Sequence, residues 1–242
     1  MKRIILMLFL ALIYVACSGP EPEVTPPETI VTTQETGPKT IFRDNFNERK
    51  NEWQQLTGIW KLGQNGFFMQ TSADPRHLNA IIYVDHPQVA DGTYETYLRV
   101  VPDLPSTLTA SEQDQKLLYN VRYIIGGGIV FRMQDRNNFY MFRLAGEEGA
   151  VLGKMVNGQW VDLANPRSAN FLTDRVKFSG NNWYRLKVDA YGNSIKCYIN
   201  DSVVASVMDN TFTLGRFGLV TFKTRADFDF MSVTDKTALE TK

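Results

Sequence analysis

The chain has 242 residues, enough for one large domain or two small ones, and carries 26 Lys and Arg against 26 Asp and Glu. This balance argues against a nucleic-acid partner, which would require a clear basic excess. Two Cys exclude a disulfide-stapled scaffold, and two His leave little for a histidine-built metal site.

The first residues have the pattern of a secretory leader. Lys2 and Arg3 precede residues 4–16, an unbroken run of 13 apolar residues. This run is too short to span a bilayer, which needs about 20 residues. It matches the apolar region of a signal peptide, so we expect residues 1–16 to be removed on export.

Cys17 stands at the expected cleavage point. Residues 14–17, Tyr-Val-Ala-Cys, resemble the bacterial lipobox, in which the Cys becomes diacylated. The resemblance implies a lipid anchor at Cys17, and two acyl chains are sufficient for stable membrane attachment. Ser18 in the following position favours the outer membrane as the location in the cell envelope. An ordinary signal peptide that contains a Cys remains the alternative.

The segment after Cys17 is predicted to be a disordered tether. Residues 18–40 contain five Pro, six Thr and four Glu but few large apolar side chains. Such a segment cannot bury enough apolar surface to fold. We therefore expect residues 17–40 to connect the lipid to a folded domain.

The remaining sequence predicts one all-β domain. Between residues 41 and 234 the apolar residues follow a period of two, and no long stretch favours a helical period. Turn signals recur about every ten residues, which indicates an antiparallel sandwich or barrel. Residues 235–242 are expected to form a short tail.

Three consecutive hairpins are predicted between Ile129 and Trp160. Residues 135–138 form the first loop, which places Met133 opposite Tyr140. A turn at residues 146–149 then places Met141 opposite Lys154. Asn157-Gly158 is a strong signal for a two-residue hairpin loop, and it places Trp160 opposite Met155 on the core face.

The outer face of these predicted strands is the candidate ligand-binding surface. Arg132, Arg143 and Lys154 are expected to lie close together with Phe139 between them, and Gln134 adds a further hydrogen-bond donor. Exposed aromatic rings can stack on the CH faces of sugars, while such donors can reach sugar hydroxyls. The alternative is a solvated sheet face whose long basic side chains cover apolar neighbours.

A further hairpin is predicted around Gly192-Asn193, where Gly can adopt the positive φ that a two-residue loop needs. The expected pairs are Ala190 with Ile195, Val188 with Cys197 and Leu186 with Ile199, all on one buried face. Cys197 is therefore expected to be a buried free thiol that acts as a small apolar side chain.

Several motifs resemble the laminin G-like and concanavalin A-like jelly-roll domains of bacteria. They occur in order over residues 41–234, and the segments that carry them are 42–46, Trp60, 127–144, 183–189, 195–200, 215–222 and 226–233. The resemblance implies a two-sheet antiparallel jelly-roll sandwich. The family includes carbohydrate-binding modules, lectin-like adhesion domains, glycoside hydrolases and 3-keto-disaccharide hydrolase-like domains. Many members carry calcium at a sandwich edge, so calcium is an optional ligand, and no other cofactor or metal is expected.

The expected function is that of a membrane-anchored, non-catalytic module that is exposed outside the cytoplasm and binds carbohydrate or a glycan-bearing surface. A glycoside or 3-keto-disaccharide hydrolase-like enzyme is the first alternative, and a structural or partner-docking envelope protein is the second. Cleavage of a glycosidic bond needs paired carboxyl groups. The nearest strings are Glu112-Gln-Asp114, which lacks the final Glu of the family motif, and Asp227 with Asp229, which could share a strand face. No catalytic residue is therefore assigned.

Overall fold

A computed structural model describes residues 38–48, 52–63, 67–70, 79–101, 126–145, 149–165, 169, 182–222 and 224–236. The chain divides into two units, Met1–Glu35 and Thr36–Lys242, and every described residue lies in the second unit. The expected leader, Cys17, most of the expected tether and the string 112–114 lie outside the described residues. Within the described residues, no helix is long and apolar enough to cross a membrane.

The described chain is built of antiparallel strands arranged in two sheets. Sheet A has eight strands, and β1 pairs with β15 beside its main path. In order across the sheet they are β13 (Ser202–Met208), β12 (Ser194–Ile199), β11 (Trp183–Tyr191), β6 (Gly92–Val101), β15 (Arg225–Asp235), β4 (Phe68–Gln70) and β3 (Trp60–Leu62), with β1 (Lys39–Asp44) on β15.

Sheet B has seven strands. In order across the sheet they are β10 (Gln159–Ala164), β9 (Ala150–Val156), β8 (Asn138–Leu144), β7 (Gly126–Asp135), β14 (Gly215–Phe222), β5 (Asn79–Val89) and β2 (Trp53–Gln55). The expectation of an all-β, two-sheet antiparallel sandwich is confirmed. The strands begin at Lys39, inside the range expected for the tether, because Lys39 pairs with Asp235 at the edge of sheet A.

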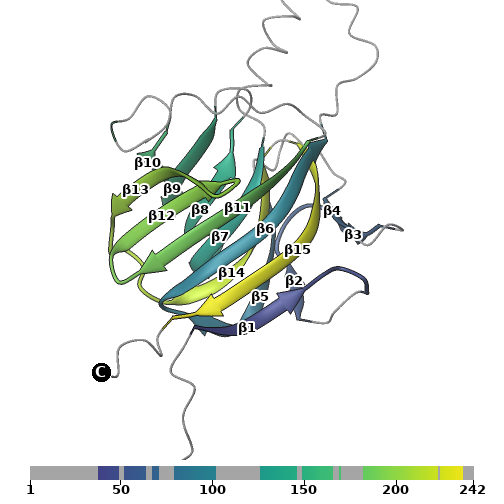
Figure 1. Ribbon diagram of the computed structural model, residues 1–242, viewed down its shortest axis with the longest axis horizontal. Helices are drawn as coiled ribbons and strands as arrows, with labels where there is room; N and C mark the ends of the chain where they lie inside the picture. Colours follow the sequence, from purple (N-terminus) through teal and green to yellow (C-terminus); the bar gives the residue numbers. More distant parts are fainter. Residues whose placement is uncertain are drawn as a thin grey trace, which may run out of the picture. The chain divides into compact units, whose positions relative to one another are not determined.

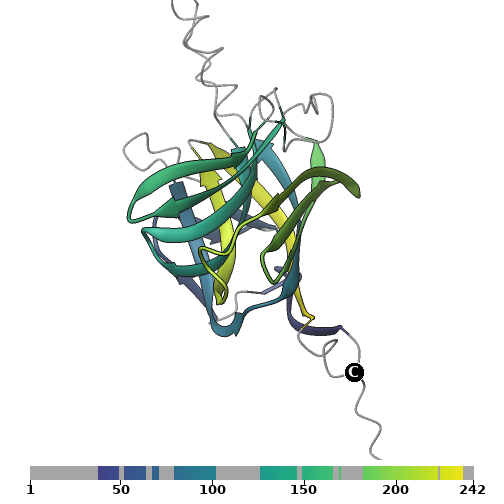
Figure 2. The same ribbon diagram turned by 90° about the vertical axis from the view of Figure 1, so that its left-hand side faces the viewer.

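The two sheets form the layers of a sandwich, with sheet A in front in Figure 1 and the layers seen from the side in Figure 2. The main hydrophobic core lies between them and includes Leu98, Leu186 and Phe228 from sheet A and Phe131, Phe142 and Leu219 from sheet B. Side chains alternate across a strand, so burial of one set of residues directs the other set outward.

The hairpin of β11 and β12 has the expected register. Ala190 pairs with Ile195, Val188 with Cys197 and Leu186 with Ile199, and all six side chains are buried. Gly192 has a φ of 54°, as its two-residue loop requires. Cys197 is a buried free cysteine, as expected, and burial raises the pKa of its thiol well above the ordinary value.

The register of β7 and β8 differs from the expected one because β7 contains a bulge. Asp135 pairs with Asn138 at the loop, but Phe131 rather than Met133 pairs with Tyr140. The irregularity includes Arg132, which has a φ of 46°. A bulge changes the faces of the residues beyond it, and Met133 accordingly belongs to a second apolar cluster rather than to the core between the sheets.

The register of β8 and β9 differs from the expected one by a single residue. Met141 pairs with Gly153, while Lys154 pairs with Tyr140. A slip of one residue moves a side chain to the other face of the sheet, so Lys154 shares a face with the core residue Tyr140. The expected pair Trp160–Met155 is confirmed, but both side chains pack against the second cluster and not the core between the sheets.

The second apolar cluster shows that sheet B is apolar on both faces. It consists of the buried residues Ile81, Val130, Met133, Phe139, Met141 and Val220. Val130 and Met141 alternate along their strands with Phe131 and Phe142, which belong to the core between the sheets. On the central strands of sheet B, the outer face is therefore mainly apolar and buried, and partly buried apolar side chains such as Trp160 and Met155 pack against it.

Arg132 ties together three turns at one end of the sandwich. Its side chain is completely buried, and its guanidinium donates to the backbone carbonyls of Ala90 at 2.8 Å, Gly192 at 2.9 Å and Phe212 at 3.2 Å. It also pairs with Asp91 at 3.0 Å. Removing a buried cation leaves these acceptors without their donor, which is costly in free energy.

We predict that Arg132→Met lowers the free energy of unfolding by about 3–5 kcal/mol, the range typical of breaking a buried ion pair. Urea denaturation followed by tryptophan fluorescence measures this loss. Arg136→Met is the matched control, because Arg136 lies exposed in the β7–β8 turn and should change stability by no more than about 0.5 kcal/mol. Equal losses in the two variants would contradict the role given to Arg132.

Candidate ligand-binding face

The expected cluster of Arg132, Arg143, Lys154, Phe139 and Gln134 does not form an exposed surface. Arg132 is turned into the sandwich by the bulge, Phe139 is buried in the second apolar cluster, and Lys154 lies on the opposite face of sheet B. The predicted juxtaposition of the three cations is therefore wrong. The prediction failed because β7 contains a bulge and because the register of β8 and β9 differs by one residue from the expected one. A role for these residues in ligand binding stays a prediction.

Arg143 and Gln134 have structural contacts. The Arg143 guanidinium lies over the Phe222 ring at 4.4 Å and donates to the carbonyl of Leu144 at 3.1 Å. Burial lowers the pKa of Arg143 to about 10. The Gln134 side-chain amide donates to the carbonyls of Arg132 and Leu214. Arg143 thus reaches across β7 to β14, and Gln134 connects β7 to the residue that precedes β14.

Lys154 belongs to a tie between the two sheets. Its ammonium group donates to Asp209 and Thr211, each at 2.6 Å, and the Tyr140 hydroxyl donates to the same carboxylate. Burial alone would raise the pKa of Asp209, but hydrogen bonds from Lys154, Tyr140 and Thr211 outweigh it and hold the pKa at about 2. The Asp209 carboxylate is thus fixed as an acceptor for three neighbouring groups.

The outer face of sheet A has a different character, with aromatic and charged side chains in adjacent rows. Alternation directs these residues outward, because the buried Tyr94, Thr96 and Leu98 occupy the other positions on β6. We call this surface the sheet A face and define it by Arg43, Glu95, Tyr97, Arg99, Trp183, Arg185, Lys187, Tyr198, Asp227 and Phe230.

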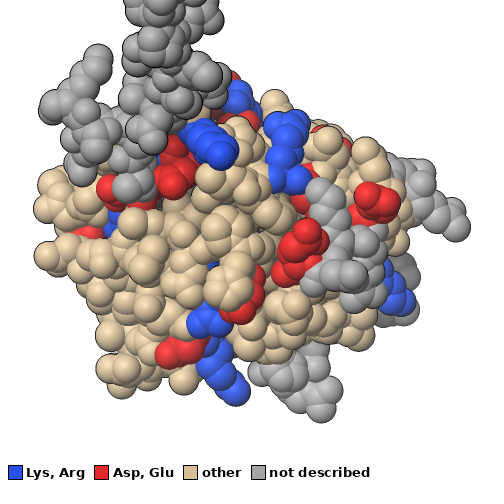
Figure 3. Space-filling view, turned by 90° about the horizontal axis from the view of Figure 1, so that it is seen from below, with Lys and Arg blue, Asp and Glu red and all other residues tan. Residues whose placement is uncertain are grey.

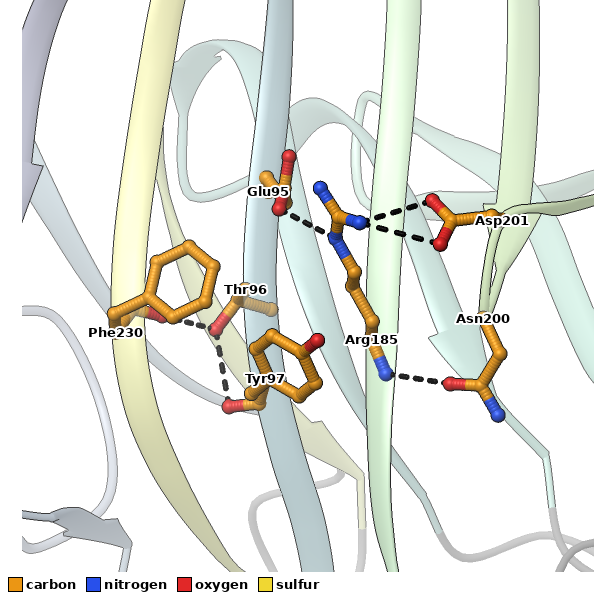
Figure 4. A network of polar contacts seen from close by, with 7 residues as sticks. All are labelled: Glu95, Thr96, Tyr97, Arg185, Asn200, Asp201 and Phe230. Atoms are coloured by element: carbon orange, nitrogen blue, oxygen red, sulfur yellow. Dashed lines mark hydrogen bonds and ion pairs between the residues drawn. The ribbon is translucent and has the colours of Figure 1, made fainter.

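Tyr97 lies at the centre of the sheet A face. Its register partners are Arg185 on β11 and Phe230 on β15. The rings of Tyr97 and Phe230 are 5.4 Å apart between centroids, and the Arg43 guanidinium lies 5.1 Å from the Phe230 centroid. Tyr97 is 36% exposed, so its ring is available to a ligand from the solvent side (Figure 4).

A bulge in β15 places Phe230 opposite Tyr97. The register shifts between Phe228 and Phe230, so Phe230 rather than Asp229 pairs with Tyr97. The Thr96 hydroxyl donates to the Phe230 carbonyl at 2.5 Å and fixes this irregular backbone. Asp229 is the extra residue of this bulge and is exposed, while Asp227 pairs in register with Arg99.

Arg185 bridges two carboxylates beside Tyr97. Its Nε donates to Glu95 at 2.5 Å, and its Nη1 donates to both oxygens of Asp201 at 3.0 and 3.2 Å (Figure 4). The hydrogen bond to Glu95 is the largest cause that raises the pKa of Arg185. The backbone N–H of Arg185 donates to Asn200, which fixes the turn that carries Asp201. This network holds a guanidinium and two carboxylates in place at the surface.

A second guanidinium is held in the next row. Arg99 donates to Asp227 through Nη2 at 2.5 Å and Nε at 3.1 Å. Its guanidinium carbon lies 5.0 Å from the Trp183 ring and 5.8 Å from the Phe67 ring, and these two rings are 5.0 Å apart. The sheet A face thus combines flat apolar rings with oriented donors and acceptors, the composition typical of small-ligand sites.

The surface at one end of the sandwich shows no dominant charge. Figure 3 views the molecule from below, and in the described part of this view Lys and Arg lie next to Asp and Glu in small groups. Among the described residues, no group of three or more His, Cys, Asp or Glu is placed to hold a metal ion. Calcium therefore stays a prediction based on the family resemblance.

Sequence reasoning found only one side of this site. The outward positions of Arg185, Lys187 and Tyr198 follow from the predicted β11–β12 hairpin. Alternation with buried residues on β6 also indicates which side chains of that strand face outward, namely Thr93, Glu95, Tyr97 and Arg99. The pairing of β6 with β11 joins segments about 90 residues apart, and no local turn pattern reveals such a pair.

Comparison with known proteins supports the assignment of the fold. No family model matches the chain, and no curated protein matches it. Among solved structures it is similar to the carbohydrate binding module CBM66 from Bacillus subtilis, with a TM-score of 0.56 and 22% identity over 74% of this chain and 92% of that one. The chain has a concanavalin A-like jelly-roll fold.

Enzymes share this fold. The β-glucanase of Bacillus licheniformis matches with a TM-score of 0.50 and 12% identity over 83% of this chain and 99% of that one. A GlcNAcα1-4Gal-releasing endo-β-galactosidase from Clostridium perfringens matches with a TM-score of 0.52 and 11% identity over 84% and 64%. At these identities the jelly-roll neighbours establish the architecture, and function depends on the site.

Proposed function

We propose that this chain is a non-catalytic carbohydrate-binding module and that the sheet A face is its ligand surface. The observation that carries the proposal is the exposed Tyr97 ring between Phe230 and the Arg185 network. A sugar presents apolar CH faces and hydroxyl groups, and this surface offers a ring to the first and fixed polar groups to the second. The likeness to a carbohydrate-binding module supports the same function.

Among the described carboxylates, no resolved pKa shift has the direction that the acid of a glycosidase requires. A glycosidase needs a carboxylic acid with a raised pKa close to a second carboxylate. The shifts found among the described carboxylates, at Asp135, Asp189 and Asp209, all lower the pKa. The backbone N–H of Asn137 is the main cause at Asp135. At Asp189 burial alone would raise the pKa, but the hydrogen bonds from Thr93 and Lys236 outweigh this effect, and the net result is a lowered pKa.

The central test is loss of binding when the exposed ring is removed. We predict that Tyr97→Ala weakens glycan binding about tenfold, which corresponds to about 1.4 kcal/mol and lies within the range for one aromatic contact. Retardation in native gels that contain a panel of polysaccharides measures the affinity.

Tyr191→Ala is the matched control for this variant. Tyr191 is similarly exposed, at 39%, but lies six residues from Arg185 along β11, about 20 Å away. The control should bind like the wild type. The proposal fails if the wild type binds no polysaccharide of the panel, or if both variants lose the same affinity.

We also propose, from the sequence alone, that a lipid on Cys17 anchors this module in the cell envelope, with the outer membrane as its location. Two acyl chains supply the attachment. Cys17→Ser should therefore move the protein from the membrane fraction to the soluble fraction on centrifugation. Cys197→Ala, which removes the buried thiol, should stay with the membranes. Sedimentation of Cys17→Ser with the membranes would contradict the anchor.

A further inference from the structure

The charges around Tyr97 are arranged as closed ion pairs. Arg185 contacts Glu95 at 2.5 Å and Asp201 at 3.0 Å, and Arg99 contacts Asp227 at 2.5 Å. Two guanidinium charges thus face three carboxylate charges in the centre of the sheet A face. The central positive groups are already neutralised by neighbours on the same surface.

This arrangement is unfavourable for an acidic ligand. Asp201 is the most exposed member of the network, with 63% of its side chain accessible. A carboxylate or sulfate placed beside Tyr97 would meet Asp201 and Glu95 and would compete with them for Arg185. Like charges at close range repel, and polar groups placed against the wrong ligand are a common means of discrimination.

The cations at the rim contact aromatic rings and lie outside the central ion pairs. Arg43 lies over the Phe230 ring, and Lys187 lies 4.1 Å from the centroid of the Tyr198 ring. Lys187 also lies near Asp189, whose carboxylate accepts hydrogen bonds from Thr93 and Lys236. A cation over a ring keeps its charge, so Arg43 and Lys187 remain positive groups at the rim, whereas Arg185 and Arg99 in the centre are paired with carboxylates.

The same closed pairs suit an uncharged polyol. A hydroxyl group both donates and accepts hydrogen bonds, while a guanidinium only donates and a carboxylate only accepts. Side-by-side pairs such as Arg185 with Glu95 and Arg99 with Asp227 offer both functions at fixed positions. The Tyr97 ring between the two pairs provides the apolar contact.

We infer that the sheet A face selects neutral glycans and discriminates against glycans that carry carboxylate or sulfate groups. This inference rests on the proposed function, because it specifies the ligand class of the same surface. Binding is driven by ring contact and by hydrogen bonds to hydroxyl groups, and the carboxylates of Glu95, Asp201 and Asp227 exclude anions.

The test compares two sets of polysaccharides by affinity electrophoresis and calorimetry. The neutral set is laminarin, pullulan and dextran, and the acidic set is alginate, polygalacturonate and heparin. We expect binding to at least one neutral member and at least about tenfold weaker binding to every acidic member. Affinity for the neutral ligand should change by no more than about twofold in 1 M salt, where the Debye length is about 3 Å.

A charge variant tests the cause of the discrimination. Glu95→Gln removes one negative charge but keeps an amide oxygen that can accept from Arg185, so the ratio of neutral to acidic affinity should fall severalfold. Glu52→Gln is the matched control, because Glu52 is exposed next to β2 of sheet B, and it should leave the ratio unchanged. An unchanged ratio in Glu95→Gln would overturn the proposed role of the carboxylates.

The outcomes separate this inference from the proposed function. Equal or tighter binding of an acidic polysaccharide through Tyr97 overturns the inference and leaves glycan binding intact. Absence of binding to both sets overturns the inference and the proposed function together. Neutral binding that weakens strongly with salt also overturns the inference, because ring contacts and hydrogen bonds to an uncharged ligand are little affected by ionic screening.

Discussion

Mutual burial of the inner faces of the two sheets is the constraint on which the rest of the structure depends. Leu98 and Leu186 must face sheet B, so their neighbours Tyr97, Arg99 and Arg185 must face solvent. A slip of one residue between β6 and β11 would turn one of the two strands over, which would bury Arg99 or Arg185 and expose the core side chains of that strand. The same hydrophobic requirement that stabilises the sandwich therefore fixes the candidate ligand surface.

The sequence was sufficient where local turn chemistry and alternation agree. The β11–β12 hairpin could be registered residue by residue, because Gly192 fits its loop and the slipped alternatives would mix apolar and charged residues on one face. Burial of Cys197 followed from that register. The fold class could be predicted for the same reason, since period-two alternation and frequent turns extend over the whole domain.

The sequence was insufficient where the backbone departs from regular pairing. The bulge at Arg132 reverses the faces of the residues that follow it, and the register between β8 and β9 differs by one residue from the expected one. Because of these two local features, the three cations of the predicted surface do not lie together on one face. The bulge before Phe230 and the long-range pairing of β6 with β11 likewise leave no pattern in a single sequence, although together they assemble the sheet A face.

The jelly-roll fold positions both sheets but does not decide which surface binds a ligand. The central claim is that the ligand contacts the outer face of sheet A. Titration of the isotopically labelled protein with a neutral oligosaccharide, followed through backbone amide NMR signals, tests this claim most directly. The account predicts shifts concentrated in β6, β11 and β15 around Tyr97, Arg185 and Phe230. Shifts concentrated in β8, β9 and β10 of sheet B would contradict it.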